Sequence, residues 1–309
     1  MVTNTTPEIH PKSFRIRMVL AFAAIYVLWG TTFLAIRIVV EEMPPLFAAG
    51  ARFFIAGVVL FGFMRLKGGA NPTPIQWRNL AIMGLTMFVA EYGPLFWGEK
   101  YVPSGIVSVL AATIPLLTLV LEMLVLREGK VPRIVVLATL LGFAGVGVLL
   151  MPTGTQHFAL IPCLAILAGS ISWSLGTVLS RSMELPKSRP LTSGATMMLG
   201  GGTLLLLSAA FGELHTLPHI SLRGGLALLY LIVCGSLLAF TAFIWLLSHL
   251  PATRISSYAY VNPVIAVALG YFVAGEVITP HALLGTALVL TSVFMILRKD
   301  KVKAEDDPN

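Results

Sequence analysis

Two charged side chains, Arg52 and Glu91, lie inside long apolar stretches, where a charge is costly. A charged residue at the centre of a membrane-spanning helix costs about 2.5–3.5 kcal/mol on insertion scales, so such residues usually serve a function. We expect each to lie about seven residues, or roughly 11 Å, inside the same end of its helix, near enough to pair. They would then bind a zwitterion, or Glu91 would exchange a proton. The alternatives are a structural ion pair and an Arg52 side chain that reaches outward to water.

Aromatic and amide side chains form a second set of candidates. Trp29 and Trp173 lie deeper in their apolar stretches than the aromatic belt of a membrane protein would, and Thr32 lies in the same stretch as Trp29. Tyr258 and Asn262 are four residues apart and therefore share one face of a helix. We expect these residues to line a cavity, with the tryptophans as an aromatic wall. Simple packing and hydrogen bonding between helices are the alternatives.

Two prolines fall in the middle of apolar stretches. Pro115 and Pro263 each remove a backbone hydrogen bond and are expected to kink their helices. The carbonyl groups freed in this way would be available to a ligand, although a role in shaping or hinging the helix is the more common one.

These residues must be positioned by transmembrane helices. The chain is 57% hydrophobic and 11% charged, whereas soluble domains carry roughly 25% charged residues. A bilayer core about 30 Å thick requires about 20 apolar residues per helix. That rule predicts an all-α membrane protein of ten helices, near residues 18–38, 45–65, 79–98, 103–125, 132–151, 158–180, 192–212, 224–247, 254–274 and 280–297.

The distribution of basic residues predicts the orientation of these helices. Most of the 21 lysines and arginines fall on one side of the membrane if both termini are cytoplasmic. Residues 1–17 and 299–309 then form cytoplasmic end segments of a multi-pass protein in a bacterial inner membrane. The basic residues are scattered singly, so the net charge of +7 does not indicate nucleic-acid binding.

An internal repeat divides the predicted helices into two sets of five. A constant offset of 148 relates four landmark residues in the first half to four in the second: Pro103, Pro115, Glu128 and Pro132 match Pro251, Pro263, Glu276 and Pro280. Because five is odd, residues 18–151 and 158–298 would be inverted repeats, an architecture that permits alternating access. Subtracting 148 from Tyr258 and Asn262 gives the apolar Leu110 and Ile114, so the repeat loses its symmetry there.

The chain resembles a known transporter family at several motifs: Tyr26 to Phe33 (YVLWGTTF), Pro44 to Arg52 (PPLFAAGAR), Val102 to Gly105 (VPSG), Gly169 to Trp173 (GSISW) and Ser257 to Val264 (SYAYVNPV). Together they resemble the drug/metabolite transporter superfamily, specifically bacterial EamA-type exporters of the YedA-like group. The resemblance covers residues 18–298. It implies ten helices, a central cavity between the halves, and export of amino acids, related metabolites or drugs.

Other functions are less well supported by the sequence. A sugar-phosphate or nucleotide-sugar exchanger would need paired basic residues inside helices, and Arg52 stands alone there. An intramembrane enzyme or a structural membrane protein is the alternative from another class, but no HExxH or GxSxG pattern occurs. We therefore expect a secondary transporter with no cofactor, metal or catalytic residue, whose partners are a small-molecule substrate and the bilayer. The oligomeric state stays open, a monomer included.

Overall fold

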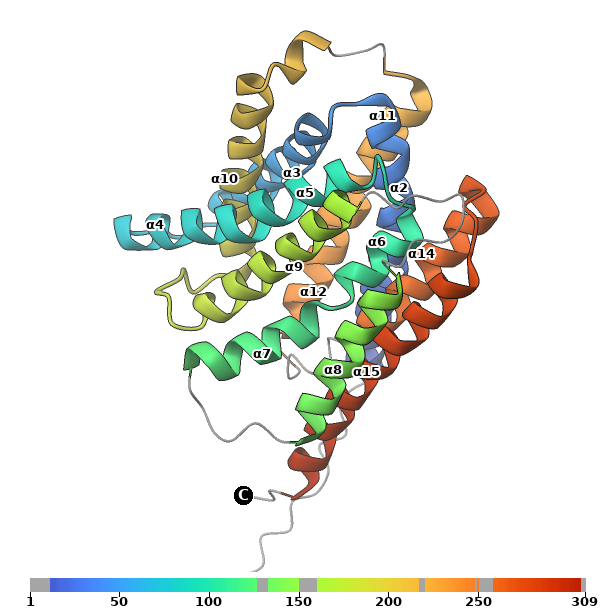
Figure 1. The fold of residues 1–309 in the computed structure, drawn as a ribbon. Coiled ribbons are helices and arrows are strands. Elements are labelled where there is room, and N and C mark those ends of the chain that lie inside the picture. Colours follow the sequence, from blue (N-terminus) through green and yellow to red (C-terminus); the bar gives the residue numbers. More distant parts are fainter. Residues whose placement is uncertain are drawn as a thin grey trace, which may run out of the picture.

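The computed structural model describes residues 12–126, 133–149, 160–216, 220–247, 249 and 258–306, and the regular elements within these ranges are all helices (Figure 1). They are α1 (Lys12–Ala23), η1 (Ala24–Leu28), α2 (Trp29–Glu42), α3 (Pro45–Leu66), α4 (Pro74–Met83), η2 (Gly84–Val89), α5 (Ala90–Gly98), α6 (Ser104–Ala111), α7 (Ile114–Leu126), α8 (Arg133–Leu149), α9 (Leu160–Ser180), α10 (Arg189–Ala210), η3 (Glu213–Thr216), α11 (Leu222–Tyr230), η4 (Leu231–Leu238), α12 (Ala239–Leu247), α14 (Tyr258–Ala274) and α15 (Pro280–Asp306).

Each of the ten ranges expected to be helical overlaps these elements within the described residues, while residues 132, 150–151, 158–159 and 254–257 of those ranges lie outside them. Seven continuous helices are long and apolar enough to cross a membrane: Ser13–Glu42, Pro45–Leu66, Pro74–Gly98, Ser104–Glu122, Leu160–Ser180, Arg189–Ala210 and Leu222–Phe243. Shorter apolar helices, Val136–Val148, Val261–Ala274 and Pro280–Ser292, occupy the three other ranges. The landmark residues Glu128, Pro132 and Pro251 lie outside the described residues.

Local sequence signals set several helix starts. The side chain of Thr73 accepts a hydrogen bond from the backbone nitrogen of Gln76 (3.3 Å), and the Gln76 side chain accepts one from the Thr73 backbone (3.1 Å). This capping box satisfies two backbone donors at the start of α4. Ser221 caps α11 in a similar way, since its hydroxyl accepts from the backbone nitrogen of Gly224 (3.2 Å).

The surface of the bundle is apolar, while charged groups are buried inside it. Large side chains such as Phe272 and Leu222 are about 80% and 79% exposed, respectively. Arg52 and Glu91, in contrast, are each only 2% exposed. An apolar exterior around buried charges is the reverse of a soluble domain, and it is the arrangement that a bilayer stabilises.

The two halves of the chain meet along α3 and α10, which lie side by side at the upper left of Figure 1. A Cβ atom added to Gly50 would lie 2.8 Å from the nitrogen of Leu205, and one added to Gly194 would lie 2.6 Å from the nitrogen of Phe61. Position 50 therefore meets 205 while position 61 meets 194, so the two helices are antiparallel. Small residues permit this close approach.

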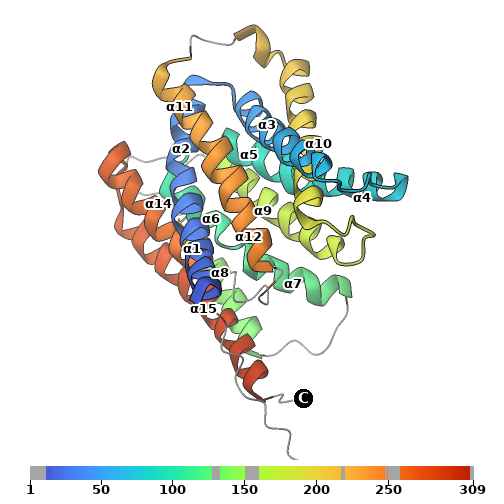
Figure 2. The same cartoon turned by 180° about the vertical axis from the view of Figure 1, so that it is seen from behind.

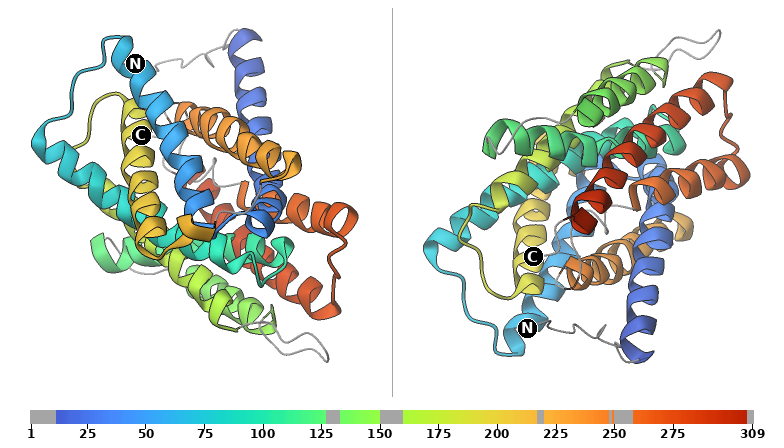
Figure 3. Two further views of the ribbon diagram at one scale, coloured as in Figure 1. Left: turned by 90° about the horizontal axis from the view of Figure 1, so that it is seen from above. Right: turned by 90° about the horizontal axis from the view of Figure 1, so that it is seen from below.

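A second antiparallel pair, α8 and α15, lies at the other end of the bundle. An added Cβ on Gly145 would lie 2.9 Å from the nitrogen of Val289, and one on Gly142 would lie 2.8 Å from the hydroxyl of Ser292. In both pairs, a helix of the first half packs against the corresponding helix of the second half. Seen from behind (Figure 2) and from above and below (Figure 3), helices of the two halves interleave around the bundle.

Three membrane-crossing helices contain π-helical segments, which place one extra residue in a turn. η1 precedes Trp29, η2 ends just before Glu91, and η4 contains Gly235 and Ser236. The segments η2 and η4 occupy corresponding places in the two halves, since adding 148 to residues 84–89 gives 232–237. In contrast, α9 is a regular α-helix throughout Leu160–Ser180.

The two predicted kinks differ in form. Pro263 lies inside α14. Pro115 is the second residue of α7, directly after a turn at Ala112 and Thr113 that separates α7 from α6. The helix is therefore interrupted just before Pro115, because proline is accommodated at the first turn of a new helix.

The contact between α3 and α10 generates a prediction about stability. In Gly57→Ala, the new Cβ would lie 2.7 Å from the Cα of Met198 and 2.8 Å from the carbonyl oxygen of Gly194. We expect overpacking to destabilise the protein by about 1–3 kcal/mol. The measurement is thermal unfolding in detergent. The matched control is Gly62→Ala on the same helix, where no atom lies within 4 Å; equal midpoints for the two variants would contradict the prediction.

Candidate functional site

The residues singled out in the sequence meet around one cavity between the two halves. Its volume is about 90 Å³, and α2, α3, α5, α6, α7, α9 and α14 contribute to its wall. All the candidate pathway residues line it: Arg52, Glu91, Tyr258, Asn262, Trp29, Trp173 and Thr32. Of the two predicted kink residues, Pro263 lines the cavity. Pro115 does not, but its neighbour Ile114 does. The structure thus brings together residues from five helices that are far apart in the sequence.

Arg52 is fixed by groups from both halves. Its Nε donates to the hydroxyl of Ser236 in η4 over 3.0 Å. Its guanidinium carbon lies 4.6 Å from the ring centre of Phe53 and 5.5 Å from that of Tyr92, which are favourable cation–π distances. Its Nη1 is buried without a hydrogen-bond partner. A donor on Arg52 is therefore free for an anionic group.

Glu91 presents an unpaired acceptor in the same cavity. Its Oε2 is buried and has no hydrogen-bond partner. The backbone of α9 passes so closely that a Cβ added to Gly169 would lie 2.7 Å from this oxygen. Arg52 and Glu91 do not form the ion pair that the sequence suggested, since Arg52 turns to Ser236 instead. Because an unsatisfied buried carboxylate is costly, Glu91 is suited to bind a proton or a cationic group.

Two aromatic clusters contribute walls to the cavity through Trp29 and Tyr258 and through Tyr92 and Trp173. In one, the ring of Trp29 lies 5.1 Å from that of Tyr258 and 6.0 Å from that of Phe240. In the other, the ring of Trp173 lies 6.0 Å from that of Tyr92. The offset of 148 relates Tyr92 to Phe240, so the two walls are counterparts. Trp29 also donates from Nε1 to the carbonyl oxygen of Gly235 (3.0 Å) in the other half.

The polar groups of α14 break this symmetry. Asn262 is buried, and its amide nitrogen, oriented to satisfy both neighbours, donates to the carbonyl oxygens of Tyr26 (3.1 Å) and Tyr258 (3.3 Å). Its counterpart Ile114 lines the same cavity. Thr32, by comparison, donates a hydrogen bond from its hydroxyl to the carbonyl oxygen of Trp29 in its own helix (2.6 Å). Asn262 therefore links α14 to the first helix as well as facing the cavity.

The cavity is small in this conformation. Ligand pockets usually measure roughly 300–1,000 Å³, so a volume of about 90 Å³ accommodates water molecules rather than a metabolite. The structure is thus a contracted state, and a larger ligand requires the surrounding helices to separate.

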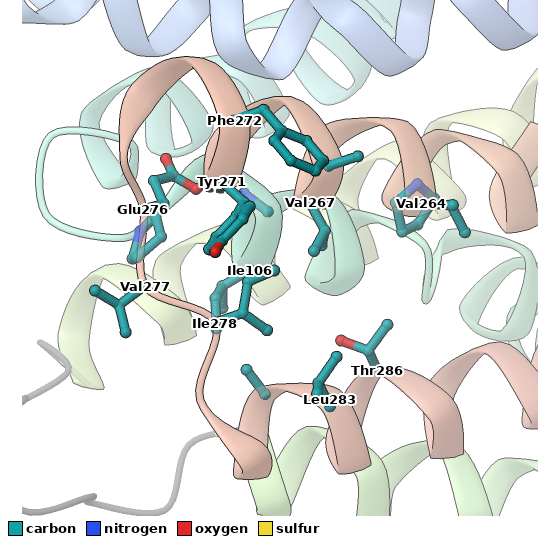
Figure 4. Close-up of a pocket in the computed structure, with 15 residues that line it drawn as sticks. Ile106, Val264, Val267, Tyr271, Phe272, Glu276, Val277, Ile278, Leu283 and Thr286 are labelled. Carbon is teal, nitrogen blue, oxygen red and sulfur yellow. Dashed lines mark hydrogen bonds between the residues drawn. The ribbon is translucent and has the colours of Figure 1, made fainter.

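A second, larger cavity of about 410 Å³ lies between α6, α14 and α15 (Figure 4). Val264 and Val267 face Leu283 and Thr286 across it, and Tyr271 and Phe272 lie at its edge. Its lining is almost entirely apolar, and several of these side chains are exposed on the outer surface of the bundle. This cavity fits hydrocarbon, whereas the smaller one holds the charged and polar groups, so we assign the site to the smaller cavity.

Sequence reasoning missed two groups that complete the site, Ser236 and Tyr92. Tyr92 adjoins Glu91 and contacts the Arg52 guanidinium. Ser236 carries no sequence signal of its own, because its role depends on the partner that η4 meets in the folded chain. Tyr92 does carry one: its counterpart Phe240 is also aromatic, which marks a repeated wall.

Comparisons with known proteins identify the family and the fold of the chain. The model of the EamA-like transporter family matches the chain twice, at residues 16–151 and 160–298. The uncharacterized inner membrane transporter YedA of Escherichia coli K12 is 35% identical over 279 residues, which cover 89% of each chain. The uncharacterized transporter YoaV of Bacillus subtilis is 26% identical, covering 91% of this chain and 96% of its own. A solved crystal structure shares the fold with a TM-score of 0.62 at 19% identity, covering 90% of this chain and 96% of that one.

The hydrogen bond between Arg52 and Ser236 generates a prediction. Hydrogen bonds to charged groups contribute about 1.5–3 kcal/mol, so Ser236→Ala should lower stability by about that amount. The measurement is thermal unfolding in detergent. Ser208→Ala is the matched control, because Ser208 is also fully buried but its hydroxyl has no hydrogen-bond partner. The effect of Ser236→Ala should disappear in an Arg52→Met background; an equal loss there would show that the hydrogen bond is not its cause.

Proposed function

Because the chain belongs to the EamA-like transporter family and is a membrane transporter rather than an enzyme, we propose that it exports small zwitterionic metabolites by alternating access. Amino acids and related compounds, including drugs of this charge type, are the substrates we infer. One observation carries this proposal: Arg52 and Glu91 face the same cavity, each with an unpaired buried atom, and do not pair with each other.

The chemistry of the cavity favours a zwitterion over other small molecules. The free Nη1 of Arg52 suits a carboxylate, and Glu91 suits an ammonium group. The aromatic walls around Trp29 and Trp173 suit an apolar or cationic portion of the substrate. A sugar phosphate is disfavoured, because Arg52 is the one basic residue lining the cavity and Glu91 would repel a phosphate.

We propose the following topology for the transport cycle. Ten helices span an inner membrane as two inverted repeats, residues 18–151 and 158–298, with the segments 1–17 and 299–309 in the cytoplasm. Support comes from the helical ranges, the antiparallel packing of α3 with α10 and of α8 with α15, and the uneven distribution of basic residues. One copy of the chain contains the whole cavity, which is compatible with a monomer.

Alternating access follows from two contacts that the repeat makes equivalent. One joins α5 to α9, and the other joins α2 to α11 and η4. The first connects the third and sixth expected helices, and the second connects the eighth and the first. We propose that the two contacts loosen alternately, so that the cavity opens to one side and then to the other. The glycine-rich pairs α3–α10 and α8–α15 would stay together as pivots.

The test is efflux from proteoliposomes that contain the purified protein. Vesicles preloaded with single amino acids, drugs or sugar phosphates are placed in an imposed pH gradient. We expect zwitterions to leave faster than from empty vesicles, and Glu91→Gln to slow efflux at least about tenfold, equivalent to about 1.4 kcal/mol of lost interaction. The dependence of the rate on the pH gradient should weaken in the same variant.

The control is Glu184→Gln, since Glu184 is exposed, lies away from the cavity and accepts a hydrogen bond from the side chain of Gln76 over 3.4 Å. This variant should transport at the wild-type rate. Selective efflux of sugar phosphates would favour the exchanger instead. If Glu91→Gln kept both the rate and the pH dependence of the wild type, Glu91 would have no part in coupling.

A further inference from the structure

A second acidic residue on the same helix, Glu99, is buried without hydrogen bonds. It follows the last residue of α5, is 0% exposed, and neither carboxyl oxygen has a partner. Nearby Glu276 differs sharply, because its Oε1 accepts from the backbone nitrogen of Ser104 (2.8 Å) and its Oε2 from that of Gly105 (3.3 Å). Glu276 thus serves the start of α6, while the carboxyl group of Glu99 has no structural task.

The position of Glu99 makes a negative charge costly. A helix C-terminus carries partial negative charge, which disfavours an anion there. The nearby Glu276 repels a negative charge on Glu99, whereas the positive charges of Arg37 and Arg52 attract it. Arg37, however, donates to the backbone carbonyl of Glu99 and to Glu41, and Arg52 donates to Ser236. Neither arginine hydrogen-bonds the Glu99 carboxyl group, so burial dominates and raises the pKa of Glu99 well above its usual range.

The other elements packed against α5 contribute few titratable groups at this end. Gly98 meets Pro162 and Ile166 of α9, whose titratable residue in this stretch is the buried Cys163. The segment η2 has none. Along the chain, Lys100 is exposed to solvent, and Glu91 and Tyr92 lie about two turns back toward the cavity. Eight residues separate Glu91 from Glu99, about 12 Å along a helix.

We propose that Glu99 is a proton-binding site that controls closure of the outer end of the transporter. In the contracted structure its carboxyl group is neutral. When α5 and α9 separate at this end, water reaches Glu99, the O–H bond breaks, and the proton passes to the outer solution. Closure then requires that a proton return to the carboxylate, because a bare charge cannot be buried without a partner. The outward direction rests on the proposed function; the neutral carboxyl group does not.

The experiment is infrared spectroscopy of the purified full-length protein across a pH series. At neutral pH we expect a carbonyl stretch from a neutral carboxyl group. Part of this band should disappear in Glu99→Gln and persist in Glu184→Gln, since Glu184 is exposed. Glu91→Gln distinguishes any contribution of the cavity acid. The absence of a neutral carboxyl band in wild-type protein at pH 7 would overturn the proposal even if Glu99→Gln failed to fold, as would an unchanged band in a folded Glu99→Gln variant.

Thermal stability gives a second readout with a definite sign. A raised pKa means that the folded state binds more protons than the unfolded state, so stability falls as pH rises above about 4.3, the usual Glu pKa. Glutamine does not titrate. The Tm of Glu99→Gln relative to wild type should therefore increase between pH 4 and pH 8. A difference in Tm between Glu99→Gln and wild type that did not change with pH would contradict proton binding by Glu99. Absence of efflux from proteoliposomes with the wild-type protein would contradict only the proposed function. The infrared and thermal-unfolding measurements on Glu99 need no substrate and would stand.

Discussion

The buried guanidinium of Arg52 is the group on which the rest of the structure depends. A full charge inside the membrane requires partners at short distances, and these come from both halves: Ser236 from one, Phe53 and Tyr92 from the other. Such distances are reached only if the helices approach very closely. Gly235, beside Ser236, permits that approach, because a Cβ added there would lie 3.0 Å from Nη2 of Arg52. Packing between the halves and electrostatics at the site are therefore two aspects of one constraint.

Much of the fold and of the site could be predicted from the sequence. The ten apolar ranges all correspond to helices, because hydrophobic length is a strong signal in membrane proteins. Arg52 and Glu91 were identified by their cost in an apolar stretch, and Tyr258 and Asn262 by their departure from the repeat. All four line one cavity. Each of these residues conflicts with its local surroundings, and such a conflict has to be resolved by tertiary structure. Their role in transport stays a prediction.

Other features depend on tertiary contacts and could not be predicted. The sequence suggested that Arg52 and Glu91 pair, yet Arg52 donates to Ser236. A single serine in an apolar stretch gives no sign in the sequence that it will meet an arginine. The interruption before Pro115 and the π-helical segments depend on how a helix fits its neighbours. Glu99 lies one residue beyond the range 79–98 that the sequence predicts to be helical, so it was not among the charges expected inside a helix. Comparison with the repeat would have marked it, since the corresponding residue is the apolar Leu247.

The paired π-helical segments η2 and η4 also record the history of the chain. A π-helical turn arises when one residue is inserted into an α-helix, and here the insertion occupies corresponding places in both halves. A single insertion in an ancestral five-helix unit, copied when its gene was duplicated and fused, explains both. η1 has no counterpart in α9, which is a regular α-helix. The widened turns before Glu91 and at Ser236 are thus shared by the two halves, whereas the one before Trp29 marks a place where the halves differ.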